Sequence, residues 1–167
     1  ERLAMLGHQP DETLFESIFA GFKSLADKKR EVFDNDLEAL ANGHDPEASG
    51  PWHIEQWHTA SHNGGTASAS VRLSHDDGFQ VSEASIGDGP VHAILSAFER
   101  ATGHALTIRN FNIHSLSNGG DAQGQASLIV DYQGREVRGN GVSTDIVEAA
   151  ALAALEVVNR IERIKAP

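Results

Sequence analysis

Two glycine-rich stretches contain the residues best suited to bind a small ligand. Residues 139–149 read GNGVSTDIVEA and residues 87–95 read GDGPVHAIL. In each stretch, glycines precede the expected start of a helix. The first amide groups of a helix have no internal partners, and the helix dipole places about half a positive charge there. Because glycine lets the backbone approach a ligand closely, each stretch could hold a carboxylate or a phosphate.

The side chains near the two expected helix starts suit an amino acid. Three acids, Asp88, Asp145 and Glu148, could meet an ammonium group. The nearby apolar residues are Val91, Ile94, Leu95, Ile146, Ala149 and Ala150. Capping of the helices is an equally frequent role for Asp88 and Asp145, and the two roles can coexist. One such glycine turn is more often structural than ligand-binding, but two related copies could face each other across one cleft.

The elements that must position these stretches form a duplicated pattern. Alternating segments predict strands at 52–61, 66–75 and 79–85, followed by a helix at 87–103. The pattern then repeats, with strands at 105–117, 125–132 and 135–139 and a helix at 140–163. The sequence thus predicts an α+β fold of two βββα repeats, 52–104 and 105–167, related by an internal pseudo-twofold axis.

The first part of the chain has a different pattern. Residues 11–30 carry apolar residues at helical spacing, with Asp11 as the expected N-cap, and residues 34–41 predict a shorter helix. The turn-rich segment 42–51 predicts a linker, so we place a helical subdomain at 1–45 and the duplicated domain at 46–167. The apolar stripe of the first helix packs either on its own chain or across a dimer.

Composition excludes several classes of function. The formal charge is −11 and there is no cysteine. Such an excess of acids argues against nucleic acid and anionic membranes as partners, and the absence of cysteine excludes disulfides and thiolate metal sites. No signal peptide and no apolar run of about 18 residues is visible. We expect a cytoplasmic protein, and since the only methionine is Met5, a piece of a longer chain.

The histidines and tryptophans invite further hypotheses. Nine histidines raise the question of a metal, but strict alternation would point His53 and His58 to opposite faces of a strand. We therefore predict no metal in this chain. We also predict no other cofactor and no catalytic residue, because the sequence offers no convincing set of nucleophile, base and oxyanion donors. The same alternation predicts that one of Trp52 and Trp57 lies in the core while the other faces a partner.

Residues 139–150 (GNGVSTDIVEAA) and 85–93 (SIGDGPVHA) resemble the C-terminal regulatory domain of the 2-isopropylmalate synthases. The first stretch matches the family motif at Gly139, Gly141, Val142, Ser143, Asp145, Ile146, Val147, Glu148 and Ala149. The second matches at Gly87, Asp88, Gly89, Pro90, Val91 and Ala93. Residues 20–41 look like the linker subdomain that precedes this domain in the family. Two positions depart from the pattern: His92 replaces an aspartate or asparagine, and Ala150 replaces a common serine.

The resemblance implies a domain that forms a homodimer and binds leucine as feedback inhibitor. Leucine would lie between the two repeats or near the dimer interface. The implied effector-binding residues are Gly87, Asp88, Gly89, Pro90, Val91, His92, Ala93, Gly139, Asn140, Gly141, Val142, Ser143, Asp145 and Ile146. Inhibition would be a coupling free energy of about 1–3 kcal/mol between this site and the catalytic site.

The implied enzyme condenses acetyl-CoA with 2-oxoisovalerate in leucine biosynthesis. Its family uses a divalent metal in a TIM barrel that precedes the regulatory domain, so we expect this chain to be inactive alone. Two alternatives stay open. The chain could be the regulatory domain of a citramalate synthase that binds isoleucine. It could also be a purely structural dimerisation module whose effector site has decayed, as the departures at His92 and Ala150 would allow.

Overall fold

A computed structural model describes residues 2–5, 10–28, 37, 40–41, 50–115 and 123–165. Contacts divide the chain into two units, residues 1–48 and residues 49–167, and each is described by itself. Most of the helix expected at 34–41 and of the linker at 42–51 falls outside the described residues, as do Lys29 and Arg30 at the expected end of the first helix.

The first unit contains α1 (Arg2–Met5) and α2 (Glu12–Lys28). Asp11 caps α2, because its Oδ1 accepts a hydrogen bond from the amide of Leu14 at 2.8 Å, which confirms the predicted cap. Three phenylalanines line one side of α2. The rings of Phe15 and Phe19 stack with centroids 6.1 Å apart, and those of Phe19 and Phe22 at 6.5 Å. Phe15 and Phe19 remain about half exposed.

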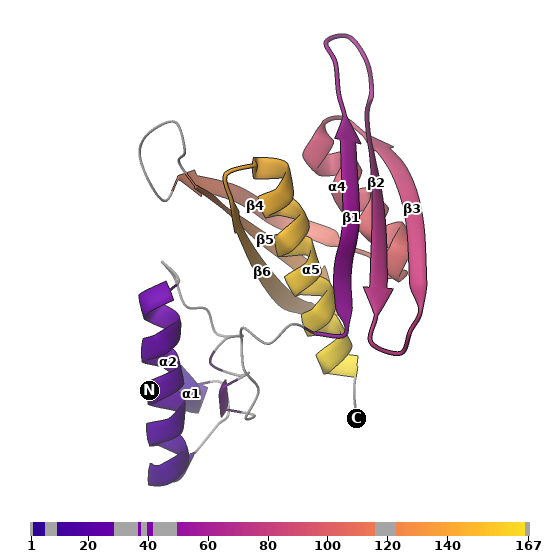
Figure 1. Cartoon of the computed structure of the whole chain (residues 1–167). Coiled ribbons are helices and arrows are strands. Elements are labelled where there is room, and N and C mark those ends of the chain that lie inside the picture. Colours follow the sequence, from indigo (N-terminus) through magenta and orange to yellow (C-terminus); the bar gives the residue numbers. More distant parts are fainter. Residues whose placement is uncertain are drawn as a thin grey trace. The chain divides into compact units, whose positions relative to one another are not determined.

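The second unit consists of two three-stranded antiparallel sheets, each followed by a helix (Figure 1). The first repeat contains β1 (Trp52–Ala60), β2 (Ala67–His75), β3 (Gln80–Gly87) and α4 (Pro90–Thr102). The second contains β4 (Thr107–Ser115), β5 (Gly124–Tyr132), β6 (Arg135–Ser143) and α5 (Ile146–Lys165). Both sheets have their strands in sequence order. The predicted α+β class and the βββα repeat are confirmed.

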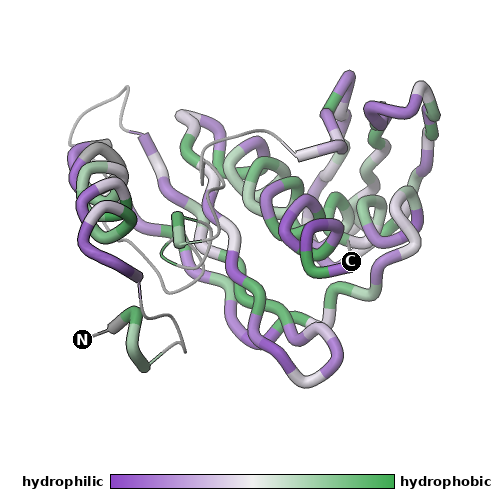
Figure 2. Tube along the Cα trace, turned by 90° about the horizontal axis from the view of Figure 1, so that it is seen from below, coloured by the Kyte–Doolittle hydropathy of each residue, from purple (hydrophilic) through white to green (hydrophobic). Residues whose placement is uncertain are grey.

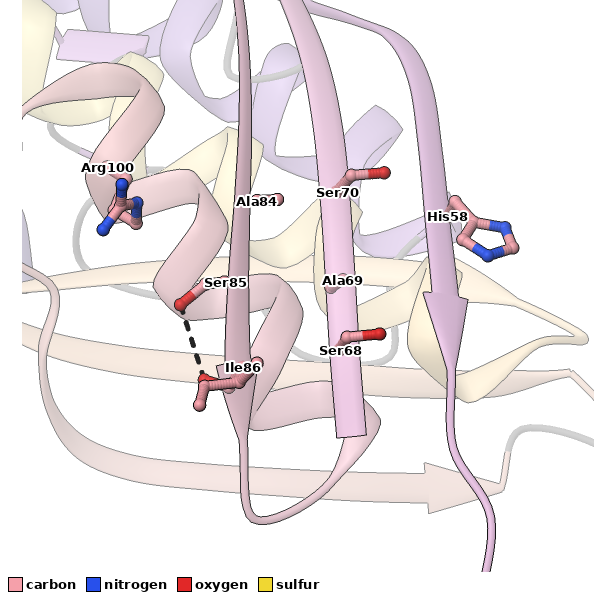
Figure 3. A pocket seen from close by; sticks show the side chains of 8 residues that line it. All are labelled: His58, Ser68, Ala69, Ser70, Ala84, Ser85, Ile86 and Arg100. Carbon is pink, nitrogen blue, oxygen red and sulfur yellow. Dashed lines mark hydrogen bonds between the residues drawn. The ribbon is translucent and has the colours of Figure 1, made fainter. Parts of the chain in front are cut away.

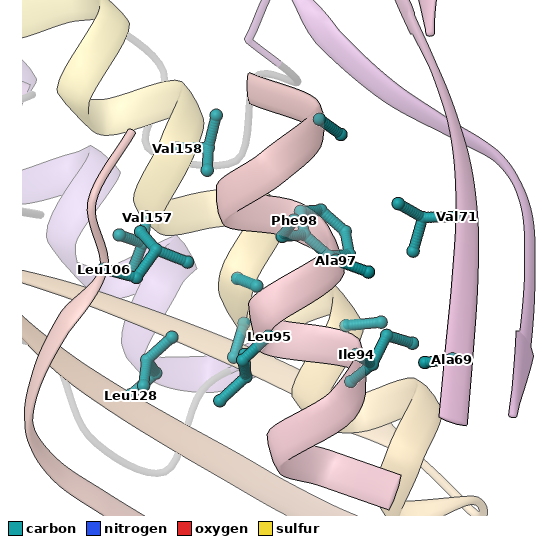
Figure 4. Packing of buried hydrophobic residues seen from close by; sticks show 14 of the residues in the cluster. Ala69, Val71, Ile94, Leu95, Ala97, Phe98, Leu106, Leu128, Val157 and Val158 are labelled. Atoms are coloured by element: carbon teal, nitrogen blue, oxygen red, sulfur yellow. The ribbon is translucent and has the colours of Figure 1, made fainter. Parts of the chain in front are cut away.

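Alternation in the central strands produces this arrangement. In β2, Ala67, Ala69, Val71 and Leu73 are buried, while the serines and arginine between them are exposed. The buried side faces α4, and Figure 4 shows Ile94, Ala97 and Phe98 of α4 beside Ala69 and Val71. In β5 the buried residues Ala126, Leu128 and Val130 play the same part beneath α5. Each sheet therefore buries one face under its own helix.

The two helices also pack against each other, so the unit has one core. Both helices carry small buried residues: Ala93, Ala97 and Ala101 lie on α4, and a run of alanines lies on α5. Figure 2 shows the hydrophobic stretches of both helices beside those of the strands. The helices are thus sandwiched between their sheets rather than lying on the outside.

A β-bulge in β1 changes which side chains share a face. The register shifts between Ile54 and Gln56. As a result Trp52 and Trp57 pair with His75 and Val71, which lie on one face of β2, and both tryptophans pack on the core. His53 and His58 likewise pair with Ser74 and Ser70 on the other face. The alternation predicted from the sequence was wrong here. The one extra residue at the bulge turns every side chain beyond it to the opposite face of the strand.

The seam between the repeats is a polar cluster on α5. Asn159 binds both backbone groups of Trp52: its Oδ1 accepts from the amide at 2.9 Å and its Nδ2 donates to the carbonyl at 3.0 Å. Glu162 accepts from the indole Nε1 of Trp52 at 3.4 Å and lies 2.6 Å from Nε2 of the buried His104. The last helix therefore holds the first strand and the segment after α4 together.

Glu162 makes the stability of this unit depend on pH. Burial by itself raises the pKa of Glu162, but hydrogen bonds with His104 and Trp52 and the charges of His104 and Lys165 hold it below its ordinary value of 4.5. A carboxylate with a lowered folded-state pKa stabilises the fold above its unfolded pKa, and this stabilisation is lost as pH falls through the folded pKa. We expect the unfolding free energy to fall as the solution is acidified below about 4.5, less so in Glu162→Gln. Urea unfolding of both proteins between acid and neutral pH checks this; identical pH slopes would contradict it.

No helix in the described ranges is long and apolar enough to cross a membrane. Within the same residues, no group of three or more histidine, cysteine, aspartate or glutamate side chains is placed to hold a metal ion.

Candidate functional site

The start of α4 is open to solvent. Gly89 is the N-cap residue, with φ −153° and ψ 171°, and no side chain of the described residues caps the helix. Pro90 occupies the first helical position and has no amide hydrogen, and the first helical bond runs from the amide of Ala93 to the carbonyl of Gly89. The amides of Val91 and His92 therefore point out of the helix end, where the dipole favours an anion.

Asp88 and His92 flank this helix start. Asp88 is fully exposed and does not cap α4, so the capping role considered for it was wrong. Its amide instead donates to Nδ1 of His92 at 3.3 Å, and its Oδ2 lies 3.5 Å from the same nitrogen. His92 itself is about half exposed. The carboxylate and the imidazole thus stand beside the open amides without closing them off.

The start of α5 is closed by its own side chains. Oδ1 of Asp145 accepts from the amides of Val147 and Glu148 at 2.7 and 3.3 Å. Ser143 Oγ accepts from the amide of Asp145 at 3.0 Å and donates to the carboxylate of Glu148. Capping, the alternative role for Asp145, is confirmed. The two helix starts are therefore not chemically equivalent, although both lie at the same end of the unit (Figure 1).

The glycines at 139 and 141 lie in strand β6, not in a turn. The sequence placed the end of that strand at 139, but β6 continues to Ser143 and pairs with β5 along its length. A Cβ on Gly139 would lie 2.2 Å from the carbonyl oxygen of Ala153, and one on Gly141 would lie 2.1 Å from that of Ala149. These glycines let α5 approach the sheet, so their amides do not form the second anion site expected from the sequence.

Strand alternation places Asn140 and Val142 on the face of β6 opposite to that of Gly139 and Gly141. Asn140 Oδ1 accepts from Ser127 Oγ at 2.7 Å and from Gln125 Nε2 at 3.3 Å, on the face of the sheet opposite α5. Val142 pairs with Gln125 and shares that face. The second stretch therefore brings only Ser143, Asp145 and Ile146 to the helix start, and of these Ile146 is half exposed.

The family model of the LeuA allosteric (dimerisation) domain matches residues 31–162. The matched segment includes both glycine stretches and both helix starts. The chain belongs to this family. It is therefore a regulatory and dimerisation domain, as the motif resemblance implied.

Curated relatives of this LeuA allosteric domain are 2-isopropylmalate synthases. That of Proteus mirabilis (strain HI4320) is 38% identical over 163 residues, covering 97% of this chain and 31% of the relative. That of Xanthomonas campestris pv. campestris (strain B100) is 41% identical, covering 98% and 31%. That of Stenotrophomonas maltophilia (strain K279a) is 42% identical, covering 97% and 30%. The chain thus spans about a third of the length of these relatives.

A shallow hollow of about 460 Å³ lies on the first sheet of the LeuA allosteric domain, next to the first motif. Small side chains of β2 and β3 line most of it, with His58 and Arg100 at its margins (Figure 3). Figure 3 shows Ser68, Ser70 and His58 pointing away from α4, so this hollow is not a cleft between the helix starts. Arg100, the charged side chain among its lining residues, forms an ion pair with Glu83 at 3.2 Å.

Two residues at the second helix start, Gly124 and Ile113, were not predicted from the sequence. Gly124 at the beginning of β5 lies beside Ile146 and Ile113: a Cβ on it would be 3.8 Å from a methyl group of each. Conversely Ile94, Leu95, Ala149 and Ala150, expected near the site, are buried in the core of the domain. Ala150 is fully buried, so its departure from the family pattern concerns packing. No local pattern marks Gly124, because its neighbours come from another strand and a helix.

Proposed function

We propose that this chain is the regulatory domain of a 2-isopropylmalate synthase and binds leucine as feedback inhibitor. Under this proposal the condensation of acetyl-CoA with 2-oxoisovalerate, and the divalent metal it requires, belong to the part of the enzyme outside this chain. The chain itself would carry no catalytic residue and no cofactor. We further propose a cytoplasmic location. The support is the family match together with the names of the relatives.

The open start of α4 is the observation that favours a ligand. The amides of Val91 and His92 suit a carboxylate, and the exposed carboxylate of Asp88 suits an ammonium group. An aliphatic side chain would find apolar surface on the partly buried Val91. The proposed effector residues are Gly87, Asp88, Gly89, Pro90, Val91, His92, Ala93, Gly139, Asn140, Gly141, Val142, Ser143, Asp145 and Ile146. Of these, Gly87 would act indirectly by leaving room for α4, and Gly139 and Gly141 by leaving room for α5.

Substitution of one amide tests this binding mode. Proline is tolerated in the first turn of a helix and removes the N–H without adding charge, so Val91→Pro is the informative variant and Val91→Ala its matched control. We expect calorimetry to detect leucine binding to the wild-type chain, and Val91→Pro to weaken it at least about tenfold more than Val91→Ala, or about 1.4 kcal/mol. Isoleucine and valine titrations show which amino acid is preferred.

Two outcomes would count against this proposal. If Val91→Pro and Val91→Ala bound leucine equally well, the α4 amides would not be part of the site. If a chain shown to be dimeric bound no branched-chain amino acid at millimolar concentration, the purely structural module would be the remaining hypothesis. The closed start of α5 favours that second candidate, since only one of the two expected anion sites is available. Preference for isoleucine would favour a citramalate synthase regulatory domain.

A further inference from the structure

The helix side of β4 carries an uncovered apolar surface. Ile108, Phe111 and Ile113 pair with Val130, Leu128 and Ala126 of β5, so they share the face on which α5 packs. Their partners on β5 are fully buried, yet Ile108 is 43% and Ile113 41% exposed. The reason is that α5 lies over β5 and β6, while β4 forms the edge of the sheet.

This surface continues to the start of α5. Ile113 and Ile146 both lie beside Gly124, where a Cβ would be 3.8 Å from a methyl group of each. Ile146 is 50% exposed. We call Ile108, Phe111, Ile113 and Ile146 the β4 stripe. Phe111 is partly buried and packs on the core, whereas the three isoleucines are exposed. Isolated exposed isoleucines need no explanation, but several on one apolar face usually mark a contact surface.

The first repeat shows how the strand equivalent to β4 is covered. In the first repeat, β1 occupies the position that β4 has in the second, and α5 reaches across to cover it. Trp52 of β1 is 6% exposed and is held by Asn159 and Glu162 of α5. Since α4 packs on β2, β3 and α5, no helix of the second unit is left to cover β4. In the described part of the chain, no helix covers β4 in the way that α5 covers β1.

Charge distribution points to a second copy of this chain as the cover. Each chain carries a formal charge of −11, so two copies repel each other over most of their surface. The sequence of β4, TIRNFNIHS, contains no acid and includes Arg109 and His114. Asp131 of the neighbouring strand β5 is paired with Arg109. Beside Ile146, the carboxylates of Asp145 and Glu148 are hydrogen-bonded at the start of α5. Two β4 stripes can therefore meet with little like-charge repulsion.

We infer that the β4 stripe is the self-association surface of this dimerisation domain, packed against a second copy of the chain. A twofold contact would place equivalent stripes together, with Arg109 and the polar side chains of β4 at its rim. The inference depends on the dimerisation role of the family and not on leucine binding. Ile146 is also among the proposed effector residues, so the variants that test the stripe are at Ile108 and Ile113, which are not.

Paired aspartate substitutions test the surface. We expect Ile113→Asp and Ile108→Asp to raise the dimer dissociation constant at least about a hundredfold, because each places a charge at the centre of an apolar contact. Ile86→Asp is the matched control, since Ile86 is 68% exposed on the first sheet. Sedimentation equilibrium over a concentration series measures the constants, and circular dichroism checks folding. Folded Ile113→Asp and Ile108→Asp that remain dimeric, or dissociation by Ile86→Asp alone, would overturn the inference.

A measurement on the unmodified 167-residue chain avoids reliance on folded variants. Hydrogen exchange is compared above and below the dissociation constant. We expect concentration-dependent protection of 107–115 and 146–149. Protection only at the phenylalanine face of α2 or on the first sheet would overturn the inference, as would a chain that stays monomeric. If Ile113→Asp stays dimeric but changes the hydrogen exchange of residues 12–28, the stripe contacts α2 instead. That result would also overturn the inference.

Discussion

Replacement of Gly141 by alanine is expected to lower the unfolding free energy by about 3 kcal/mol, at the upper end of the range for overpacking. The added Cβ would lie 2.1 Å from the carbonyl oxygen of Ala149, 2.7 Å from Leu152 Cβ and 2.8 Å from the amide nitrogen of Ala153. Two of these three are backbone atoms of α5, so no side-chain rotation relieves the clash. The helix must move away from β6, and the alanine contacts beneath it are lost.

Gly89→Ala is the control for Gly141→Ala. Gly89 also belongs to a glycine pair before a helix, but a Cβ there has no neighbour within 4 Å and its φ of −153° suits any residue. We expect its unfolding free energy to stay within about 0.5 kcal/mol of wild type. Urea unfolding followed by circular dichroism measures both variants. Equal stabilities of Gly141→Ala and Gly89→Ala would mean that Gly141 is not needed for close packing of α5.

Asn159→Ala is expected to lower the unfolding free energy by about 3 kcal/mol. The variant removes both hydrogen bonds to the backbone of Trp52 and leaves its buried amide and carbonyl without their partner. The cost of an unsatisfied buried group exceeds the net value of one hydrogen bond, and here two groups are affected. Because Asn159 joins α5 to β1, the loss should loosen the contact between the repeats.

Two comparisons make the test of Asn159 specific. Ile164→Ala changes the same helix at a 39% exposed position and should have a small effect. Asn159→Asp keeps an acceptor for the Trp52 amide but loses the donor to its carbonyl, and introduces a buried charge, so it should not restore stability. Thermal unfolding followed by tryptophan fluorescence is suitable, since the chain has only two tryptophans. An Asn159→Ala variant as stable as Ile164→Ala would contradict the proposed role.

The βββα repeat could be predicted because its signals are local. Apolar alternation in ASASVRL and the turn residues before each helix depend on neighbours within a few positions. The bulge in β1 could not be predicted in this way. Its extra residue changes no composition or period that a short window reveals, yet it moves both Trp52 and Trp57 to the core side. The hydrogen-bonding register is chosen by the packing of the whole strand.

The two glycine stretches looked alike in the sequence, and the family motif treats them as a pair. Tertiary packing gives them different tasks. Gly87 ends β3 and leaves room for α4, as Gly139 and Gly141 leave room for α5: a Cβ on Gly87 would lie 2.5 Å from the amide nitrogen of Ala93. The difference lies at Gly89, where the chain turns and leaves the amides of α4 uncapped. Ser143 and Asp145 then close the second helix start. Glycine leaves space beside the backbone because it has no side chain. Tertiary packing decides whether a ligand or a helix fills that space.

The class of fold, the duplication, the Asp11 cap and the membership in a regulatory family all follow from residue types and their spacing along the chain. The inequality of the two helix starts, the bond between Asn159 and β1, and the uncovered face of β4 follow from contacts between residues far apart in sequence. Trp52 and Asn159 are separated by 107 positions. Short-range order is encoded by backbone preference and periodicity, while these long-range contacts arise only when both repeats bury their apolar faces in one core.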